Sequence, residues 1–548
     1  MSVKWGNTMR YKSQGSIILL LFACSLLAAC MGSSAENPTP TVPGIREDNA
    51  TTTNALQAST IANVSQTPVT GGLQTPATAG NSQIPATSTS AKEQCPSAVS
   101  LALPEVSMEV SKEAKNILRQ TDAVTITYYG DSVGCGSKLD LLLTNKFTTT
   151  TGIMVNVIPK PGDATAAYAT YDALFQSRSP DVDVMMLDII WSQAFAQHLE
   201  DLGSYRILDS VSGKQITKES STVDRKLIAM PLFRDVGVLY YRKDLIKPDE
   251  LDQIKTWDGF EKVAKRIQAE QRKGNSAFWG FVWQGAAYEG LTCNALEWLY
   301  SHGGYNTQGG VQFNSKETRK ALNRARRWIK GAEPISPAGV TRYKEDNTLK
   351  VFADGNAAFM RHWPNAYMYM IGNGKLNPDQ VGVAQLPRDE GQPSVGILGG
   401  AQLGISVYSS NEQKKRAAAA FIAYMTDADV QAWRAQVGSY YPTIQSKEVV
   451  NTPQGKVTLK TVLDKTMPAE MQIFVQAPIL RPTNPAGVDY NAVSVAFFQG
   501  VHQYLELNRQ QEPTDAEQDQ ELNQILKLIE QRMRRVCTSP SCPQLFSQ

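Results

Sequence analysis

Several short stretches of the chain place charged side chains beside aromatic rings. They contain Asp188 with Trp191, Asp235 with Phe233, Glu289 with Tyr288 and Trp283, Trp363 after His362, and Arg481 before Pro482. Carboxylates and guanidinium groups take sugar hydroxyls in paired hydrogen bonds, and aromatic rings pack against the apolar C–H face of a pyranose. The combination therefore favours recognition of a carbohydrate.

Each of these residues also has a purely structural interpretation. A carboxylate at a strand end can cap the next helix, and one at a helix start interacts with the helix dipole. These alternatives apply to Asp188 and Glu289, respectively. The others are pairing of Asp235 with Arg234 or Arg242, a salt bridge for Arg481, a chain crossing at Gly399 and Gly400, and interior packing for Trp191, Trp283 and Tyr288.

Three short apolar runs have the composition of β-strands. They cover residues 123–129, 152–158 and 182–190, and the first is followed by Leu139, Leu142, Leu143 and Phe147 at helical spacing. The alternation of strands and helices predicts a parallel, doubly wound α/β sheet. Asp188 would then lie at the carboxyl edge of that sheet, where such folds bind ligands.

Helical patterns dominate the later part of the chain. Thr256 can cap a helix that carries Phe260, Val263, Ala264 and Ile267. Thr514 and Glu517 form a capping-box pattern ahead of Leu522, Ile525, Leu526 and Ile529. A strand-rich stretch returns at residues 397–408, far from the first sheet. A chain that crosses between two lobes more than once explains this order.

The N-terminal segment has the pattern of an export signal. Lys4, Arg10 and Lys12 precede an apolar run that is too short to span a bilayer, since a spanning helix needs about 20 residues. The run ends in LAACMGSS, in which the residues up to Cys30 resemble the lipobox of bacterial lipoproteins. We therefore expect a lipoprotein signal peptide over residues 1–29 and lipid attachment to Cys30. The alternative is an ordinary signal peptide with an incidental cysteine.

Residues 30–94 consist mainly of Thr, Pro, Ala, Ser, Asn and Gly. A segment with so few large apolar residues cannot bury enough surface to offset its ordering entropy. We expect a disordered linker whose ends lie roughly 45 Å apart on average. Such a linker would keep a folded body close to the membrane.

Size and charge exclude several classes of protein. About 440 residues remain after the signal and the linker, which is too many for one core and typical of two lobes. The net charge is +2, and no basic run is interleaved with aromatic residues, which argues against nucleic-acid binding. The four scattered histidines and the cysteine spacing argue against zinc, and we expect neither a metal nor a cofactor.

Five cysteines follow Cys30, namely Cys95, Cys135, Cys293, Cys537 and Cys542. Because five is an odd number, at least one of them is free or pairs between chains. The expected export of the chain permits disulfides. The sequence leaves open which partner Cys95 takes and whether Cys537 joins Cys542.

Eight stretches in order resemble the extracellular solute-binding lipoproteins of ABC sugar importers, and the trehalose/maltose-binding branch in particular. They are PDVDVMMLDIIW, AMPLFRDVGVLYYRKDLI, TWDGF, GFVWQGAAYEGL, HGG, FADGNAAFMRHWPNAY, LGGAQLGIS and RPTNPAGVDY. The resemblance runs from about residue 123 to about residue 507. It implies a two-lobed periplasmic-binding-protein fold of type II, with a ligand cleft between two α/β lobes. It also places chain crossings near residues 231–241, 396–405 and 472–481.

The resemblance implies that nine residues contact the ligand: Asp188, Asp235, Glu289, Trp363, Gly399, Gly400, Arg481, Asp131 and Ser132. Asp188 and Asp235 would hold hydroxyls of one ring, Trp363 would stack on the sugar, and Arg481 with Glu289 would close the far side. The chain departs from its relatives at Ala401, where a tryptophan often follows the LGG motif. The loop of Asp131 and Ser132 departs from the usual pattern as well.

The resemblance also sets the expected organisation. We expect an N-terminal lobe from residues 118–236 and 400–470, a C-terminal lobe from residues 237–399 and 471–536, and a tail over 537–548. We expect a monomeric binding protein, not an enzyme, that is held by lipid outside the cytoplasmic membrane. It would deliver trehalose, maltose or a similar α-glucoside to an ABC permease, and act indirectly with the ATPase of that permease. The alternatives are an exported glycoside hydrolase and a structural surface lipoprotein.

Overall fold

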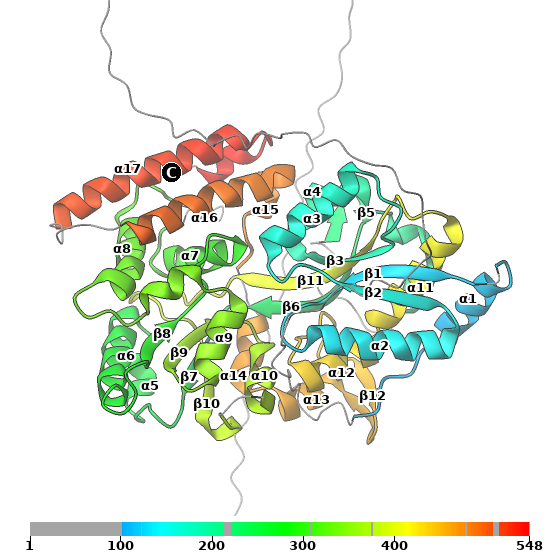
Figure 1. Ribbon diagram of the computed structural model, residues 1–548, viewed down its shortest axis with the longest axis horizontal. Helices are drawn as coiled ribbons and strands as arrows, with labels where there is room; N and C mark the ends of the chain where they lie inside the picture. The colour runs from blue at the N-terminus through cyan, green and yellow to red at the C-terminus, as the bar shows by residue number, and fades with distance from the viewer. Residues whose placement is uncertain are drawn as a thin grey trace, which may run out of the picture. The chain divides into compact units, whose positions relative to one another are not determined.

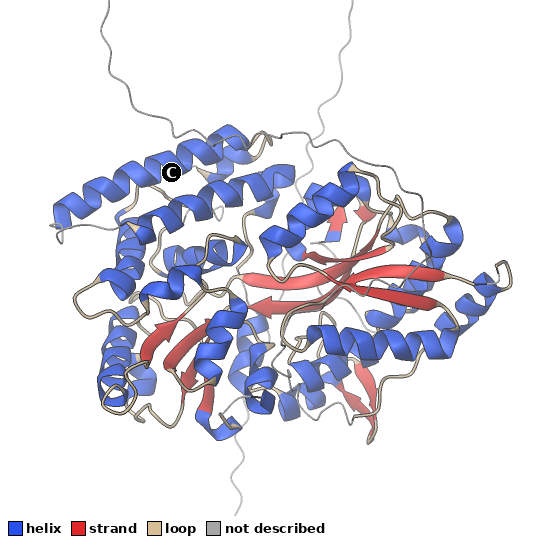
Figure 2. Cartoon of the chain, in the orientation of Figure 1, coloured by secondary structure: helices blue, strands red, loops and turns tan. Residues whose placement is uncertain are grey.

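The computed structural model describes residues 101–121, 123–211, 221–305, 310–373, 376–476, 479–507 and 515–546. The expected signal peptide, the lipidation site at Cys30, the linker and Cys95 lie outside the described residues, as does the expected helix cap at Thr514. Strands gather in two groups, each with helices around it (Figures 1 and 2).

The first group is a five-stranded sheet with the order β2-β1-β3-β11-β6. Its strands are β1 Thr125–Gly130, β2 Met154–Pro159, β3 Val184–Asp188, β6 Met230–Val236 and β11 Leu398–Ile405. The pairs of β1 with β2 and with β3 are parallel, whereas β11 runs antiparallel to both β3 and β6. The predicted parallel arrangement is confirmed for β1, β2 and β3, but the sheet as a whole is mixed because β11 runs antiparallel to its neighbours. In the chain, β11 follows the four strands of the second group, and it returns to the first sheet between β3 and β6. It therefore does not arrive through a strand–helix–strand crossover.

Helices flank this sheet to form the N-terminal lobe. They are α1 Met108–Leu118, α2 Gly136–Thr151, α3 Ala164–Gln176, α4 Ser192–Phe195, α11 Glu412–Met425 and α12 Ala428–Gly438. The apolar face predicted for α2 is confirmed, because Leu139, Leu143 and Phe147 are at most 1% exposed. The ring of Phe147 packs edge-on against Phe421 of α11, with 5.3 Å between ring centres.

The second group is a four-stranded sheet with the order β10-β7-β9-β8. Its strands are β7 Val238–Arg242, β8 Trp279–Val282, β9 Ala357–His362 and β10 Val381–Ala384. The helices α5 Glu250–Gln253, α6 Trp257–Gln271, α7 Glu289–Ser301, α8 Lys316–Lys330, α9 Glu345–Ala353 and α10 Ala366–Asn373 complete most of the C-terminal lobe. The predicted cap of α6 is confirmed, because the hydroxyl of Thr256 accepts a hydrogen bond from the Gly259 amide.

Five further helices follow β11 and α12: α13 Leu459–Thr466, α14 Ala469–Gln476, α15 Thr483–Ala486, α16 Tyr490–Glu506 and α17 Asp515–Val536. α16 and α17 lie side by side (orange and red in Figure 1), and the predicted apolar residues of α17, Leu522, Ile525, Leu526 and Ile529, are all buried. Two small hairpins consist of β4 Thr222–Val223 with β5 Lys226–Leu227, and of β12 Val449–Thr452 with β13 Gly455–Thr458. Within the described part of the chain, no helix combines the length and the apolar character that crossing a membrane demands.

In the described part of the chain, three segments pass between the two lobes, and backbone hydrogen bonds join them. The first segment passes from β6 to β7 through Gly237, whose amide donates to the carbonyl of Ile397 at 3.3 Å. The second enters β11, where the Leu398 amide donates to the carbonyl of Ile479 at 2.8 Å. Ile479 belongs to the third segment, and its own amide donates to Gly396 at 2.9 Å. The chain segments between the lobes are therefore hydrogen-bonded to one another at residues 237, 396–398 and 479.

Candidate ligand-binding site

A cavity with a free volume of about 140 Å³ lies between the two lobes and is partly open to solvent. Seven of the nine residues predicted to contact a ligand line it: Asp188, Asp235, Glu289, Trp363, Gly399, Gly400 and Arg481. The three stretches of chain that join the lobes run beside this cavity, so a relative movement of the lobes would change its width.

The guanidinium of Arg481 links two of the predicted acids. Its Nη2 donates to Asp188 Oδ1 at 2.7 Å and its Nη1 donates to Glu289 Oε1 at 3.0 Å. Burial disfavours the charged guanidinium, but the surrounding groups, with Asp188 the strongest, raise the pKa of Arg481 well above its usual value. The three side chains thus form one ionic cluster, with Arg481 and Glu289 buried and Asp188 partly exposed, that joins β3 of the N-terminal lobe to α7 of the C-terminal lobe.

Glu289 is the first residue of α7 and is 5% exposed. Its carboxylate also accepts hydrogen bonds from the hydroxyls of Tyr490 at 2.7 Å and Ser494 at 2.6 Å, both on α16. Burial raises the pKa of Glu289, while Arg481 and the two hydroxyls oppose that rise. The structural and the binding interpretation of Glu289 are therefore compatible, because the residue begins α7 and its carboxylate also lines the cavity.

Strand β11, which lies between β3 and β6, positions the two aspartates. In the antiparallel registers, Ala401 lies opposite Asp188 of β3, and Gly399 lies opposite Asp235 of β6. Asp188, the last residue of β3, also accepts a hydrogen bond from the Ile190 amide at 3.3 Å, so it caps the next turn as well as binding Arg481. One strand therefore spaces both acids along the cavity.

Asp235 differs from the other acids because one of its oxygens is unsatisfied. Oδ1 is buried and has no hydrogen-bond partner, and the side chain pairs with neither Arg234 nor Arg242 among the described ion pairs. Burial, followed by the charge of Asp131, raises the pKa of Asp235 well above its usual value, and Arg361 opposes this. A buried acceptor that lines a cavity and lacks a donor is suited to a ligand hydroxyl.

We predict that Asp235→Asn stabilises the ligand-free protein at neutral pH. The folded protein holds the Asp235 proton more tightly than the unfolded chain does, so wild-type stability falls as the pH rises above the usual carboxyl pKa of 3.8. The variant lacks this loss. Its Tm should exceed that of the wild type by about 1–3 °C at pH 7–8, and the two values should converge towards pH 4.

Asp464 on α13 provides the control, because its carboxylate is exposed and pairs only with Lys460 among the described residues. Asp464→Asn should change Tm little at any pH. A wild-type protein that is more stable than Asp235→Asn at pH 8 would contradict the prediction.

The indole of Trp363 forms an aromatic wall of the cavity. The guanidinium of Arg361 lies over its ring at 3.9 Å, and Arg361 is itself held by Glu297 through bonds of 2.7 and 2.9 Å. A Cβ on Gly399 would lie 3.1 Å from the Trp363 ring, so glycine permits this close approach. At Gly400 the φ angle is +125°, and a Cβ would collide with the carbonyl oxygen of Phe233. The two glycines therefore present backbone to the cavity without a side chain.

Asp131 and Ser132 do not line the cavity, although the next residue, Val133, does. The carboxylate of Asp131 is occupied inside the N-terminal lobe. Oδ1 accepts the amides of Ser132 and Val133, and Oδ2 accepts the hydroxyl of Tyr440 at 2.7 Å. These bonds give Asp131 the role of shaping the loop before α2.

Comparison with known proteins gives a consistent match. The family model described as "Bacterial extracellular solute-binding protein" matches residues 129–432. A probable ABC transporter-binding protein from Deinococcus radiodurans is 37% identical over 391 residues, which cover 70% of this chain and 90% of the relative. The chain belongs to the bacterial extracellular solute-binding protein family. It is therefore a binding protein and not an enzyme, as the sequence motifs led us to expect.

Solved structures agree with the fold of this solute-binding protein. Maltose-bound MalE3 of T. maritima has a TM-score of 0.64 and 31% identity, and the match covers 76% of this chain and all of that one. A solute-binding protein of Agrobacterium radiobacter K84 in complex with ribitol has a TM-score of 0.61 and 19% identity, over 75% and 98% of the two chains. The expected two-lobed α/β binding-protein fold is confirmed.

Further residues of the solute-binding protein line the cavity. They include Lys160, Glu345 and Asn365, which stand outside the predicted contacts, and Trp191 and Tyr288, whose pattern favours interior packing. Tyr288 stands directly before Glu289, so the neighbouring motif could have indicated it. Glu345 begins α9 in an ordinary acidic first turn, and no signal distinguishes it from a helix-start carboxylate.

Two direct contacts fasten the lobes together at the cavity rim, in addition to the ionic cluster. Lys344 Nζ lies 2.7 Å from Asp163 Oδ2, which caps α3 on the other lobe. The amide of Glu289 donates to the hydroxyl of Thr165 at 3.1 Å. The structure therefore shows the lobes in contact across the cavity.

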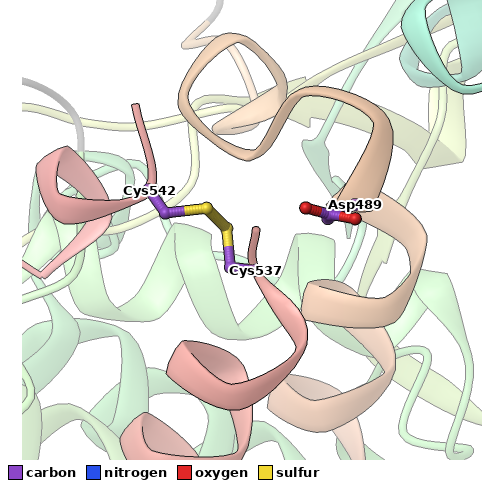
Figure 3. A group of neighbouring side chains, drawn as sticks. All are labelled: Asp489, Cys537 and Cys542. Carbon is purple, nitrogen blue, oxygen red and sulfur yellow. A yellow bond between two sulfur atoms is a disulfide. The ribbon is translucent and has the colours of Figure 1, made fainter. Parts of the chain in front are cut away.

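Asp489, Cys537 and Cys542 form a group whose ligand atoms lie close enough together for a metal (Figure 3). The two cysteines are joined in a disulfide, which removes their thiolates as ligands. Asp489 Oδ2 instead accepts the amides of Thr538 and Ser539 and the Thr538 hydroxyl. The group is thus a structural anchor for the C-terminal turn. Cys135 is disulfide-bonded as well, whereas Cys293 is free and buried.

Proposed function

We propose that the chain captures an α-glucoside such as maltose or trehalose in the cavity between its lobes and presents it to an ABC permease. The observation that carries this proposal is the unsatisfied Oδ1 of Asp235 in a cavity walled by Trp363. A sugar supplies both complements, since its hydroxyls donate to the carboxylate and its C–H face packs on the indole. Maltose in the relative from T. maritima supports the same class of ligand.

The charge of the cavity favours a neutral ligand over an anionic one. Among the described lining residues, four acidic side chains (Asp188, Asp235, Glu289 and Glu345) face two cations (Lys160 and Arg481), and Asp235, whose pKa burial raises, contributes least of the four to the negative charge. Arg481 is already committed to Asp188 and Glu289. A phosphate group would enter an excess of negative charge at low dielectric, which costs binding energy. A relative from Rhizobium meliloti that is named for binding sn-glycerol 3-phosphate therefore serves as the contrast.

We further propose that the chain acts outside the cytoplasmic membrane and is held there by lipid on Cys30. The lipobox-like stretch and the polar segment that follows it support this part of the proposal. A tether would raise the local concentration of the carrier at its permease. In this proposal the permease recognises the protein with its lobes closed. The proposed ligand contacts are the seven predicted residues that line the cavity.

The decisive experiment titrates the purified protein with maltose, trehalose, sucrose, ribitol and sn-glycerol 3-phosphate. Tryptophan emission and Tm report binding, and a ligand at 100 times its Kd should stabilise the protein by about 2.7 kcal/mol. We expect one of the α-glucosides to bind without release of glucose. Released glucose would favour the hydrolase, no response to any saccharide would favour a structural lipoprotein, and tighter binding of sn-glycerol 3-phosphate would overturn the neutral-ligand assignment.

A further inference from the structure

One carboxylate holds two aromatic walls of the cavity. Glu345 Oε1 accepts the indole N–H of Trp363 at 3.2 Å, and its Oε2 accepts the hydroxyl of Tyr288 at 2.7 Å. All three residues line the cavity. An indole has a single donor, and a phenol has a single polar atom. Each ring is therefore held at its polar end by a different oxygen of the same side chain.

The position of Glu345 is tied to the contact between the lobes. Glu345 is the first residue of α9, and the residue before it, Lys344, forms the ion pair with Asp163 across the cavity rim. The same lysine ammonium lies 5.5 Å from the centre of the Tyr288 ring. The rings of Trp363 and Tyr288 are thus held at the N-terminal end of α9, next to the contact between Lys344 and the N-terminal lobe.

We infer that Glu345 is a positioning residue that sets the distance and tilt between Trp363 and Tyr288, and thereby selects ligands with a pyranose C–H face over flexible linear polyols. The choice of ligand class rests on the proposed function. A linear polyol satisfies the acids without needing either ring, whereas a pyranose gains from rings held in fixed places. Loss of the positioning residue should therefore reduce the affinity for saccharides more than the affinity for polyols.

Glu345→Gln keeps the size of the side chain but leaves one acceptor for two donors. We expect the affinity for maltose or trehalose, whichever the wild type binds, to fall about tenfold, with a much smaller change for ribitol if the wild type binds it. Tyr288→Phe removes only the hydroxyl. If both variants act through the same contact, the effects of Tyr288→Phe and Glu345→Gln should be less than additive in the double variant.

Asp346→Asn provides the matched control, because it removes a charge from the same first turn of α9 at a residue that does not line the cavity. It should bind saccharide as the wild type does. Glu345→Gln with wild-type affinity for the saccharide, while Trp363→Ala loses it, would overturn the positioning role and leave the proposed function intact.

A second measurement needs no ligand and separates this inference from the proposed function. In protein labelled with ¹⁵N at tryptophan, the indole N–H resonance of Trp363, assigned through Trp363→Phe, should move upfield in Glu345→Gln. It should stay in place in Asp346→Asn, and the resonance of Trp279 should stay in both. An unmoved Trp363 resonance in Glu345→Gln would overturn the inference even if no saccharide binds to the wild type.

Discussion

Arg481→Met should abolish saccharide binding and lower the free energy of unfolding by about 3–5 kcal/mol, the range observed when one partner of a buried ion pair is removed. The guanidinium is 4% exposed and is the only described cation in direct contact with Asp188 and Glu289. Without it, two carboxylates remain in a cavity of low dielectric. Calorimetric titration and chemical denaturation measure the two effects.

The pH dependence of this variant follows from the same charges. With the guanidinium gone, the pKa of Glu289, which burial already raises, should rise further above its unfolded value, so the destabilisation should grow as the pH rises from 5 to 8. Adding Glu289→Gln to Arg481→Met should recover part of the lost stability, because it removes one uncompensated charge. A variant that is equally destabilised at pH 5 and pH 8 would contradict the electrostatic explanation.

Arg324 on α8 supplies the matched control for position 481. It is 3% exposed and pairs with Asp258 and Glu261, but it does not line the cavity. Arg324→Met should also destabilise the protein while the folded fraction keeps its wild-type affinity for saccharide. If Arg324→Met lost binding as Arg481→Met does, the loss would reflect general unfolding and not the cavity.

Trp363→Ala should weaken saccharide binding by about 10- to 100-fold, the effect of losing one aromatic stacking surface and its apolar contact area. The ring is fixed by Arg361 on one face and by Glu345 at its indole nitrogen, so a ligand meets a surface that loses little entropy on binding. Titration calorimetry measures the affinity, and Tm with saturating sugar should rise much less than in the wild type.

Trp279 on β8 makes an unusually close control. It also lies beneath a guanidinium, that of Arg272 at 4.1 Å, but it does not line the cavity. Trp279→Ala should lower stability and leave saccharide affinity within about twofold of the wild type. Equal losses of affinity in the two alanine variants would exclude a specific role for Trp363.

Local patterns predicted much of the fold because the signals lie within single elements. The spacing of Leu139, Leu143 and Phe147 indicated the buried face of α2, and Thr256 indicated the start of α6. The direction of β11 was not predictable in this way. Periodicity along residues 397–408 describes a strand but contains no information about the strands beside it, and here both neighbours run antiparallel.

The same limit applies to the site. The family motifs predicted that Asp188, Glu289 and Arg481 lie at one site and that each contacts the ligand. They did not predict that the three side chains contact one another. A buried guanidinium requires counter-charges, and these two acids provide them. The pairing joins residues separated by 293 and 192 positions, so no local spacing could reveal it. Glu345 contacts Tyr288 and Trp363 at separations of 57 and 18 positions, which are also beyond the reach of helix or strand periodicity.

The place of β11 in the sheet order has a consequence for synthesis. Because it separates β3 from β6, the sheet of the N-terminal lobe cannot close until the ribosome has made β7, β8, β9 and β10. A nascent chain that ends before Leu398 contains β3 and β6 with an unpaired edge on each, and unpaired strand edges promote aggregation. We expect folding to be slow and late, because the sheet depends on non-local pairing, and the emerging chain to need a chaperone until β11 has been made.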